Sequence, residues 1–311
     1  MNEKEINFLL QKNIVVEQPL AKGAYGEVYS VYHNRYQMKF AMKKIPEKCF
    51  REAELECMKT TDDQRSVNVY QYFRFEGSVY LIMEFCPNDL FKMIHERKDI
   101  SHRELERILY DTIMSVKACH DKRIAHCDIK PQNFLIDSYG RIKLSDFGLS
   151  AILEDSNAIS DHKGTILFMA PEQLMQKHYN PFASDIWALG VTLFYIITKS
   201  FPFFDTSEPM LMRKILDGSW NTSLIPNSHL TKLVSRCLVV DPEQRATVSE
   251  LLKSSYFPSL KLNSNNNKNG NQMLQKRKQF SSIIKPFSCR RQLICSRISP
   301  VSSSSLCLLA H

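Results

Sequence analysis

The residues best suited to chemistry lie between positions 126 and 148. Asp128 stands five positions before an amide, Asn133, and a second aspartate, Asp146, opens an Asp-Phe-Gly triplet further along. Asp128 could accept a proton, and the oxygens of Asn133 and Asp146 are hard ligands of the kind that Mg²⁺ prefers. Phosphoryl transfer needs such a set, because its loose transition state is stabilised by positioning and charge neutralisation. Each residue alone is an ordinary turn former, but their joint spacing predicts phosphoryl transfer.

A second candidate site lies near the N-terminus. Gly23 and Gly26 separate two strand-like runs, and Lys43 follows at the end of the next run. Glycines let backbone N–H groups approach phosphate oxygens without a side chain in the way. A hairpin turn explains the two glycines equally well, so it is the lysine downstream that favours a phosphate-binding loop.

Together these motifs resemble the eukaryotic protein kinase superfamily, over roughly residues 14 to 257. The resemblance implies an α+β, bilobal fold with a small antiparallel sheet and one helix in the N-lobe and a larger helical C-lobe. It also implies ATP and Mg²⁺ as cofactors. Lys130, two positions after Asp128, matches a lysine typical of serine/threonine kinases. The expected acceptors are therefore serine and threonine hydroxyls of protein substrates, and residues 185–190 resemble calcium/calmodulin-dependent or mitosis-related kinases.

The resemblance also assigns roles. Asp128 matches the catalytic aspartate, with Lys130 near the γ-phosphate, and Asn133 and Asp146 match the Mg²⁺ ligands. Lys43 matches the lysine that contacts the α- and β-phosphates.

That lysine needs a carboxylate partner on the helix expected over residues 50–59. Glu54 is preferred, because Cys57 and Met58 follow it at the spacing of a helix face that packs on a sheet. Glu52 is the second choice.

The nucleotide site is expected to combine the glycine-rich loop, apolar residues around the purine and the segment that joins the lobes. Met83 matches the gatekeeper, and residues 84–86 match the hinge whose backbone binds adenine. Asp89 is a candidate ribose contact. The expected ATP-binding residues are Leu20, Ala21, Lys22, Gly23, Ala24, Tyr25, Gly26, Val28, Ala41, Lys43, Met83, Glu84, Cys86 and Leu135. Ala21 replaces the first glycine of the family's loop, which predicts a modest effect on ATP affinity.

Three further matches to the family concern residues that would hold the structure in place and would not take part in the reaction. Glu172 and Arg245 match a buried ion pair of the C-lobe, and Asp185 matches the aspartate that holds the catalytic loop through backbone N–H groups. Thr165 resembles a threonine that bridges the catalytic aspartate and lysine, within a peptide-docking segment over residues 164–172.

Cys127 stands where most kinases carry an arginine before the catalytic aspartate. Without that positive charge, phosphorylation between Asp146 and Glu172 is predicted not to be strictly required for activity. Candidate phosphorylation sites there are Ser150, Ser156, Ser160 and Thr165. The rival hypothesis is a pseudokinase scaffold, which only Ala21 and Cys127 favour.

The pattern of elements agrees with two lobes. Residues 14–83 alternate strand-like runs with turns, and long helical patterns follow over residues 103–121, 183–198 and 230–238. The expected domains are an N-terminal extension (1–13), a kinase domain (14–258, with an N-lobe at 14–86 and a C-lobe at 87–258) and a disordered Asn/Ser-rich basic tail (259–311).

Composition narrows the class of protein. Nine cysteines without C-x-x-C spacing argue against a disulfide framework and a zinc site. No signal peptide and no run of roughly 20 apolar residues is visible, so a cytoplasmic, or nuclear, location is expected. The formal net charge of +8 comes largely from the tail. This predicts at most weak electrostatic contacts through the tail, and no specific nucleic-acid partner.

Overall fold

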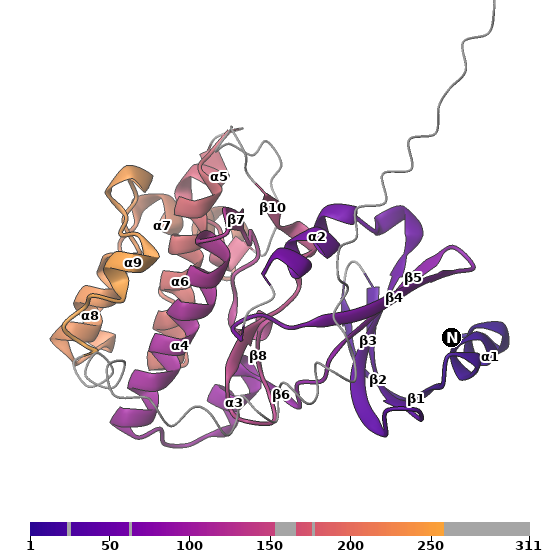
Figure 1. Ribbon diagram of the computed structural model, residues 1–311. Helices are drawn as coiled ribbons and strands as arrows, with labels where there is room; N and C mark the ends of the chain where they lie inside the picture. The colour runs from indigo at the N-terminus through magenta and orange to yellow at the C-terminus, as the bar shows by residue number, and fades with distance from the viewer. Residues whose placement is uncertain (24–25, 62–63, 153–165, 176–177, 258–311) are drawn as a thin grey trace, which may run out of the picture.

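The computed structural model describes residues 1–23, 26–61, 64–152, 166–175 and 178–257, and these form two lobes (Figure 1). Several predicted features lie outside the described residues: Ala24 and Tyr25 of the nucleotide loop, the candidate sites Ser156, Ser160 and Thr165, and the basic tail.

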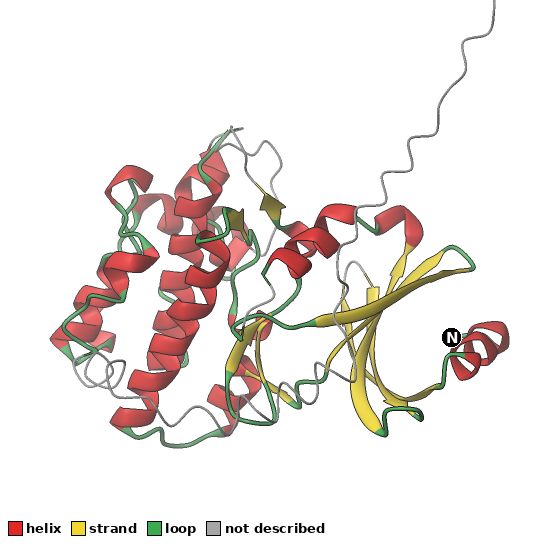
Figure 2. Cartoon of the chain, in the orientation of Figure 1, coloured by secondary structure: helices red, strands yellow, loops and turns green. Residues whose placement is uncertain are grey.

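The N-lobe contains an antiparallel five-stranded sheet in the order β1-β2-β3-β5-β4. Its strands are β1 (Ile14–Gly23), β2 (Gly26–His33), β3 (Met38–Pro46), β4 (Val69–Phe75) and β5 (Ser78–Glu84). Helix α2 (Glu52–Thr60) packs on the side of the sheet that faces the C-lobe (Figure 2). The antiparallel sheet predicted from the sequence is confirmed, and it also contains β4, whose aromatic residues follow no strict alternation with polar ones.

The N-terminal extension contains a helix in addition to the elements predicted from the sequence. Helix α1 (Glu3–Gln11) begins with a capping box, in which the Asn2 side chain accepts from the Glu5 N–H and the Glu5 carboxylate accepts from the Asn2 N–H. Leu9 is fully buried in a cluster with Ile14 and Tyr80 of the sheet. Helix α1 therefore packs on the N-lobe sheet as a second helix, in addition to α2.

The C-lobe is mainly helical. Its helices are α3 (Leu90–Glu96), α4 (His102–His120), α5 (Pro171–Met175), α6 (Pro181–Thr198), α7 (Glu208–Asp217), α8 (Ser228–Ser235) and α9 (Val248–Leu251). Helices α4 and α6 form its centre (Figure 1). By length and composition α6 could cross a membrane, but 78% of that stretch is buried inside the protein, which is the pattern of a core helix.

Short strands of the C-lobe position the candidate catalytic residues. β6 (Asn88–Asp89), β8 (Phe134–Ile136) and β9 (Ile142–Leu144) form one small sheet, and β7 (Ile124–Ala125) pairs with β10 (Ala151–Ile152). Asp128 lies in the loop after β7, Asn133 directly precedes β8, and Asp146 follows β9. The small sheets thus bring the ends of these segments to the side of the C-lobe that meets the N-lobe.

Candidate active site

The clearest feature between the lobes is an ionic cluster around Lys43. Its ammonium group donates to the Glu54 carboxylate at 2.6 Å and to the Asp146 carboxylate at 2.9 Å. The Lys43 and Glu54 side chains are 8% and 3% exposed, whereas Asp146 is 42% exposed. Strand β3, helix α2 and the segment after β9 therefore meet at one point, and one acid of the cluster remains open to solvent.

Lys43 and Asp146 hold each other in their ionised forms. Burial alone would raise the pKa of Asp146, but the adjacent Lys43 ammonium lowers it below its usual value. Burial alone would lower the pKa of Lys43, but Asp146 and Glu54 raise it. Both groups therefore stay charged at neutral pH.

Of the two candidate partners of Lys43, the structure selects Glu54. Glu52 lies on the outer side of α2, where its carboxylate pairs with Arg74 of β4 and its side chain is 68% exposed. Glu54 follows two positions later, which places it on the side of the helix that packs against the sheet.

A second cluster surrounds Asp128. Its Oδ2 accepts from the Lys130 ammonium at 2.7 Å and from the Asn133 amide at 2.9 Å. The Asn133 amide also donates to the backbone carbonyl of Asp128 at 2.7 Å. Asn133 ends a short 3-10 turn, η2 (Pro131–Asn133), which folds the chain back so that residues five positions apart touch. The three side chains predicted for this loop thus form one hydrogen-bonded group.

The two clusters are tied together through Ser145. The Ser145 N–H and hydroxyl both donate to the Asn133 carbonyl at 2.9 Å. The His126 ring nitrogen Nε2 lies 2.9 Å from the Ser145 carbonyl. Asp146 is therefore fixed relative to the loop that carries Asp128, and Lys43, Asp128, Asn133 and Asp146 belong to one connected site.

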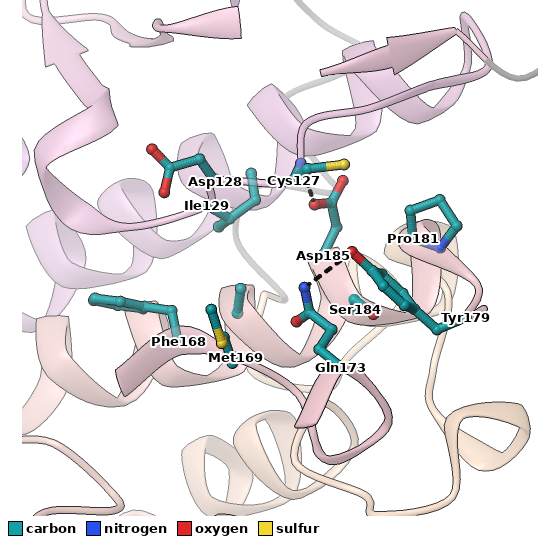
Figure 3. A pocket seen from close by; sticks show the side chains of 11 residues that line it. Cys127, Asp128, Ile129, Phe168, Met169, Gln173, Tyr179, Pro181, Ser184 and Asp185 are labelled. Carbon is teal, nitrogen blue, oxygen red and sulfur yellow. Dashed lines mark hydrogen bonds between the residues drawn. The ribbon is translucent and has the colours of Figure 1, made fainter. Parts of the chain in front are cut away.

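Asp185 of α6 holds the backbone of the catalytic loop. Its two carboxylate oxygens accept from the His126 N–H at 2.8 Å and the Cys127 N–H at 2.9 Å. Cys127 adopts a left-handed conformation with φ 63°, which is costly for a residue with a Cβ. Figure 3 shows Asp185 beneath this turn, with the Cys127 and Asp128 side chains pointing in different directions. The bonds to Asp185 compensate for the strain that orients Asp128.

A pocket joins this loop to the described part of the predicted peptide-docking segment. Ile129 and Asp128 lie on one side of it, and Phe168 and Met169 lie on the other (Figure 3). The pocket therefore borders Asp128 at the place where the resemblance would put the acceptor peptide.

The Glu172–Arg245 pair is fully enclosed. The two terminal guanidinium nitrogens of Arg245, Nη1 and Nη2, each donate to the Glu172 carboxylate at 2.6 Å, and both side chains are at most 2% exposed. Arg245 also donates to the carbonyls of Val239, Val240 and Ala183. This pair anchors α5 to the segment before α9 and lies away from the ionic cluster around Lys43.

The apolar residues expected around a purine lie along the facing edges of both lobes. Ala41 and Met83 are direct cross-strand neighbours on β3 and β5. Leu135 lies on β8 of the C-lobe, and Leu20, near the end of β1, is 38% exposed. In the hinge, the Glu84 N–H already donates to the Asn68 carbonyl at 2.9 Å, so this N–H is not available to a base.

Gly26 has a packing reason that the sequence analysis did not identify. A Cβ atom at Gly26 would lie 2.2 Å from the Lys44 carbonyl oxygen, whereas among the described residues a Cβ at Gly23 would meet nothing closer than 3.8 Å. The two residues pair across the β1–β2 hairpin. Gly26 is therefore required by the close approach of β2 to β3.

Two residues with roles predicted from the sequence, Asp89 and Ser150, make structural hydrogen bonds in the folded protein. Asp89 caps α3, because its carboxylate accepts from the Lys92 N–H at 2.9 Å. Ser150 is 1% exposed, and its hydroxyl donates to the His126 carbonyl at 3.1 Å. In this conformation Ser150 is therefore a structural residue and not an accessible phosphorylation site.

Two contacts near the site join residues far apart in the sequence. The fully buried ammonium group of Lys143 donates to the Glu84 carboxylate at 2.7 Å and so joins β9 to the hinge. Arg51 donates to the Gly148 carbonyl at 3.1 Å. No local sequence motif predicts either contact. The one sequence signal is that Lys143 lies between the apolar residues Ile142 and Leu144, which indicates a lysine in a buried strand.

The donors present suit a magnesium-bound nucleotide. The amide oxygen of Asn133 and the carboxylate of Asp146 are hard oxygen ligands on adjoining segments, and the exposed fraction of Asp146 leaves that acid accessible. Lys43 offers a fixed positive charge beside them. The residue types, their proximity and their exposure thus fit ATP and Mg²⁺.

Comparison with known proteins agrees with this geometry. Residues 14–257 match the family model described as protein kinase domain, so the chain belongs to this family and the predicted resemblance is confirmed. The chain is similar to the carbon catabolite-derepressing protein kinases of Candida glabrata (28% identity over 253 residues, 79% of this chain and 41% of the relative) and Secale cereale (30% over 258 residues, 79% and 51%). It also resembles a probable serine/threonine-protein kinase, MARK-A, of Dictyostelium discoideum (29% identity over 258 residues, 80% and 24%). The chain thus spans about half or less of the length of these relatives.

Proposed function

We propose that this chain is an ATP-dependent serine/threonine protein kinase, which transfers the γ-phosphoryl group of ATP to hydroxyl groups of protein substrates. The observation that carries the proposal is the joining of Lys43, Glu54 and Asp146 in one ionic cluster, next to the hydrogen-bonded group of Asp128, Lys130 and Asn133. The names of the relatives, several of which are serine/threonine kinases, support the choice of acceptor.

Each residue has a chemical role in this proposal. Asn133 and Asp146 would hold Mg²⁺, which when bound neutralises charge on the phosphates. Lys43, oriented by Glu54, would bind phosphate oxygens. Asp128 would orient the acceptor hydroxyl and accept its proton, while Lys130, 2.7 Å from Asp128, would stabilise negative charge on the transferred group.

The remaining expectations follow the same proposal. The kinase domain would span residues 14–258, with protein substrates binding near Phe168 and Met169 beside Asp128. Cys127 carries no positive charge for a phosphate to neutralise, which supports activity without phosphorylation of the activation segment. The basic tail would add at most weak electrostatic contacts, and the proposed location is cytoplasmic or nuclear.

The test is transfer of radiolabel from ATP to a generic protein substrate by the purified full chain. We expect transfer by the wild type in the presence of Mg²⁺, none by Asp146→Ala, and phosphoserine or phosphothreonine as the product on acid hydrolysis. A matched control is Asp205→Ala, which changes a partly buried acid paired with Lys214 in the C-lobe. If the wild type binds ATP without transferring phosphate, the pseudokinase hypothesis replaces the proposal.

A further inference from the structure

Arg51 makes an unusual contact at the start of α2. It precedes the first residue of the helix, and its side chain makes no capping hydrogen bond to it. Instead, its guanidinium nitrogen Nη1 donates to the backbone carbonyl of Gly148 at 3.1 Å. The side chain therefore joins the beginning of α2 to the Asp-Phe-Gly segment, 97 positions further along the chain.

The acceptor, Gly148, lies against the two acids of the ionic cluster. A Cβ atom at Gly148 would lie 3.4 Å from Asp146 Oδ1 and 3.8 Å from Glu54 Oε2. Gly148 therefore lies within van der Waals distance of both carboxylates. Gly148 is fixed within the short 3-10 turn η3 (Phe147–Leu149), which packs against α2.

The contact of Arg51 closes a ring of interactions. Arg51 directly precedes α2 and Glu54 lies in its first turn, where the Glu54 N–H donates to the Arg51 carbonyl at 3.0 Å. Glu54 binds Lys43, Lys43 binds Asp146, and Asp146 precedes the turn whose carbonyl Arg51 binds. If α2 moved outward, the Arg51 and Glu54 contacts would break together.

The uncharged Cys127 gives this ring a particular importance. The Cys127 backbone is held by Asp185, and its side chain offers no cation that a phosphorylated activation segment could bind. The position of α2 must therefore be maintained by contacts that exist without a phosphate. Arg51 supplies such a contact from a charged donor to a neutral carbonyl, which is stronger than a bond between two neutral groups.

We propose that Arg51 is a positioning residue, whose hydrogen bond to Gly148 holds α2 against the Asp-Phe-Gly segment and so keeps Lys43, Glu54 and Asp146 assembled without a phosphate. This inference deepens the proposed kinase function and rests on it for its catalytic consequence. The competing interpretation is that Arg51 binds a phosphate on the activation segment, in which case its effect depends on phosphorylation.

The experiment compares four full-length proteins: wild type, Arg51→Ala, Arg51→Lys and Arg103→Ala. Arg103 is a matched control, because it is an exposed arginine at the start of α4 in the C-lobe. Each protein is treated with a phosphatase, and kcat and KM for ATP are then measured. Amide hydrogen exchange of residues 52–60 and 147–150 is measured in parallel, without nucleotide.

We expect Arg51→Ala to lower kcat about five- to tenfold and to change KM for ATP less than about twofold, because fewer molecules hold the assembled cluster while the purine site is intact. Exchange in both segments should become faster. Arg51→Lys, which retains a charged donor, should recover part of both properties. Arg103→Ala should match the wild type.

The inference would be overturned if Arg51→Ala had the same kcat and the same amide exchange rates as the wild type. So would a loss of activity that appears only in protein phosphorylated on the activation segment. If the wild type transfers no phosphate, the proposed function fails, but faster exchange in Arg51→Ala alone would still support the positioning role. If Arg51→Ala does not fold, amide exchange of the same two segments in Arg51→Lys is compared with the wild type. Faster exchange in Arg51→Lys would support the positioning role, and wild-type exchange would overturn it.

Discussion

Two groups of buried charges in this protein are built differently. The Glu172–Arg245 pair is bidentate, at most 2% exposed and surrounded by backbone carbonyls that accept from the same arginine. The Lys43 cluster joins three segments through single contacts and leaves Asp146 42% exposed. The first group has every donor satisfied within the protein, whereas the second keeps a carboxylate available. The difference separates a structural ion pair from a site that can take a ligand.

The largest effect should come from Asp146→Asn. The change removes a proposed metal-ligating charge at little cost to packing, so kcat/KM should fall at least about 10³-fold, equivalent to about 4 kcal/mol of transition-state stabilisation. Stability should change by less than about 1 kcal/mol, because Lys43 retains Glu54. Kinase assays and urea unfolding check the two outcomes. Activity within about tenfold of wild type would remove Asp146 from the proposed metal site.

Arg245→Ala should give the opposite result. The substitution strands the Glu172 carboxylate in the interior and should cost about 3–5 kcal/mol of stability, measured by urea unfolding. Under conditions where the variant is folded, KM for ATP should stay near the wild-type value. The double variant Arg245→Met/Glu172→Leu is the control, since it removes both charges and should recover much of the loss. A variant that unfolds like the wild type would contradict the structural role.

Glu54→Gln tests the buried contact of the ionic cluster, between Glu54 and Lys43. The amide keeps the shape but loses the charge that orients Lys43, so kcat should fall about 10- to 100-fold. Glu52→Gln is the matched control on the same helix, because that carboxylate pairs with Arg74 at the surface, and it should leave kcat unchanged. Equal losses in both variants would show that α2 responds to its net charge and not to the Lys43 contact.

The sequence points to the candidate site residues more directly than to the contacts that hold them in place. Asp128, Lys130 and Asn133 lie within five positions of one another and form one hydrogen-bonded group, so their spacing in the sequence is enough to predict that they lie together. The partners Lys143–Glu84 and Arg51–Gly148 meet only after folding, over separations of 59 and 97 positions. Helix α1 was missed because its polar composition resembles a solvated extension, although Asn2 and Glu5 do form the capping box that starts it.

Helix α1 extends the comparison to a third buried acid. Successive residues of a strand face opposite sides of the sheet, so Lys43 points to the cleft while Lys44 points to α1. There the Glu5 carboxylate contacts the Lys44 ammonium and accepts from the Tyr80 hydroxyl at 2.6 Å. Burial alone would raise the pKa of Glu5, but these hydrogen bonds lower it to about 2.

The smallest expected effect is therefore pH-dependent and confined to stability. A carboxylate whose pKa lies near 2 when folded and at its ordinary 4.5 when unfolded stabilises the fold fully above pH 4.5. That contribution disappears as the pH falls from 4.5 towards 2. Glu5→Gln should thus lower the free energy of unfolding by about 1–2 kcal/mol at pH 7, and the difference from wild type should shrink below pH 4.5. Urea titrations across this range provide the measurement, with the exposed Glu3→Gln as control. A difference that stays constant down to pH 2 would mean that the Glu5 carboxylate gains nothing from its charge, and that α1 is held to the sheet by Leu9 and its apolar neighbours alone.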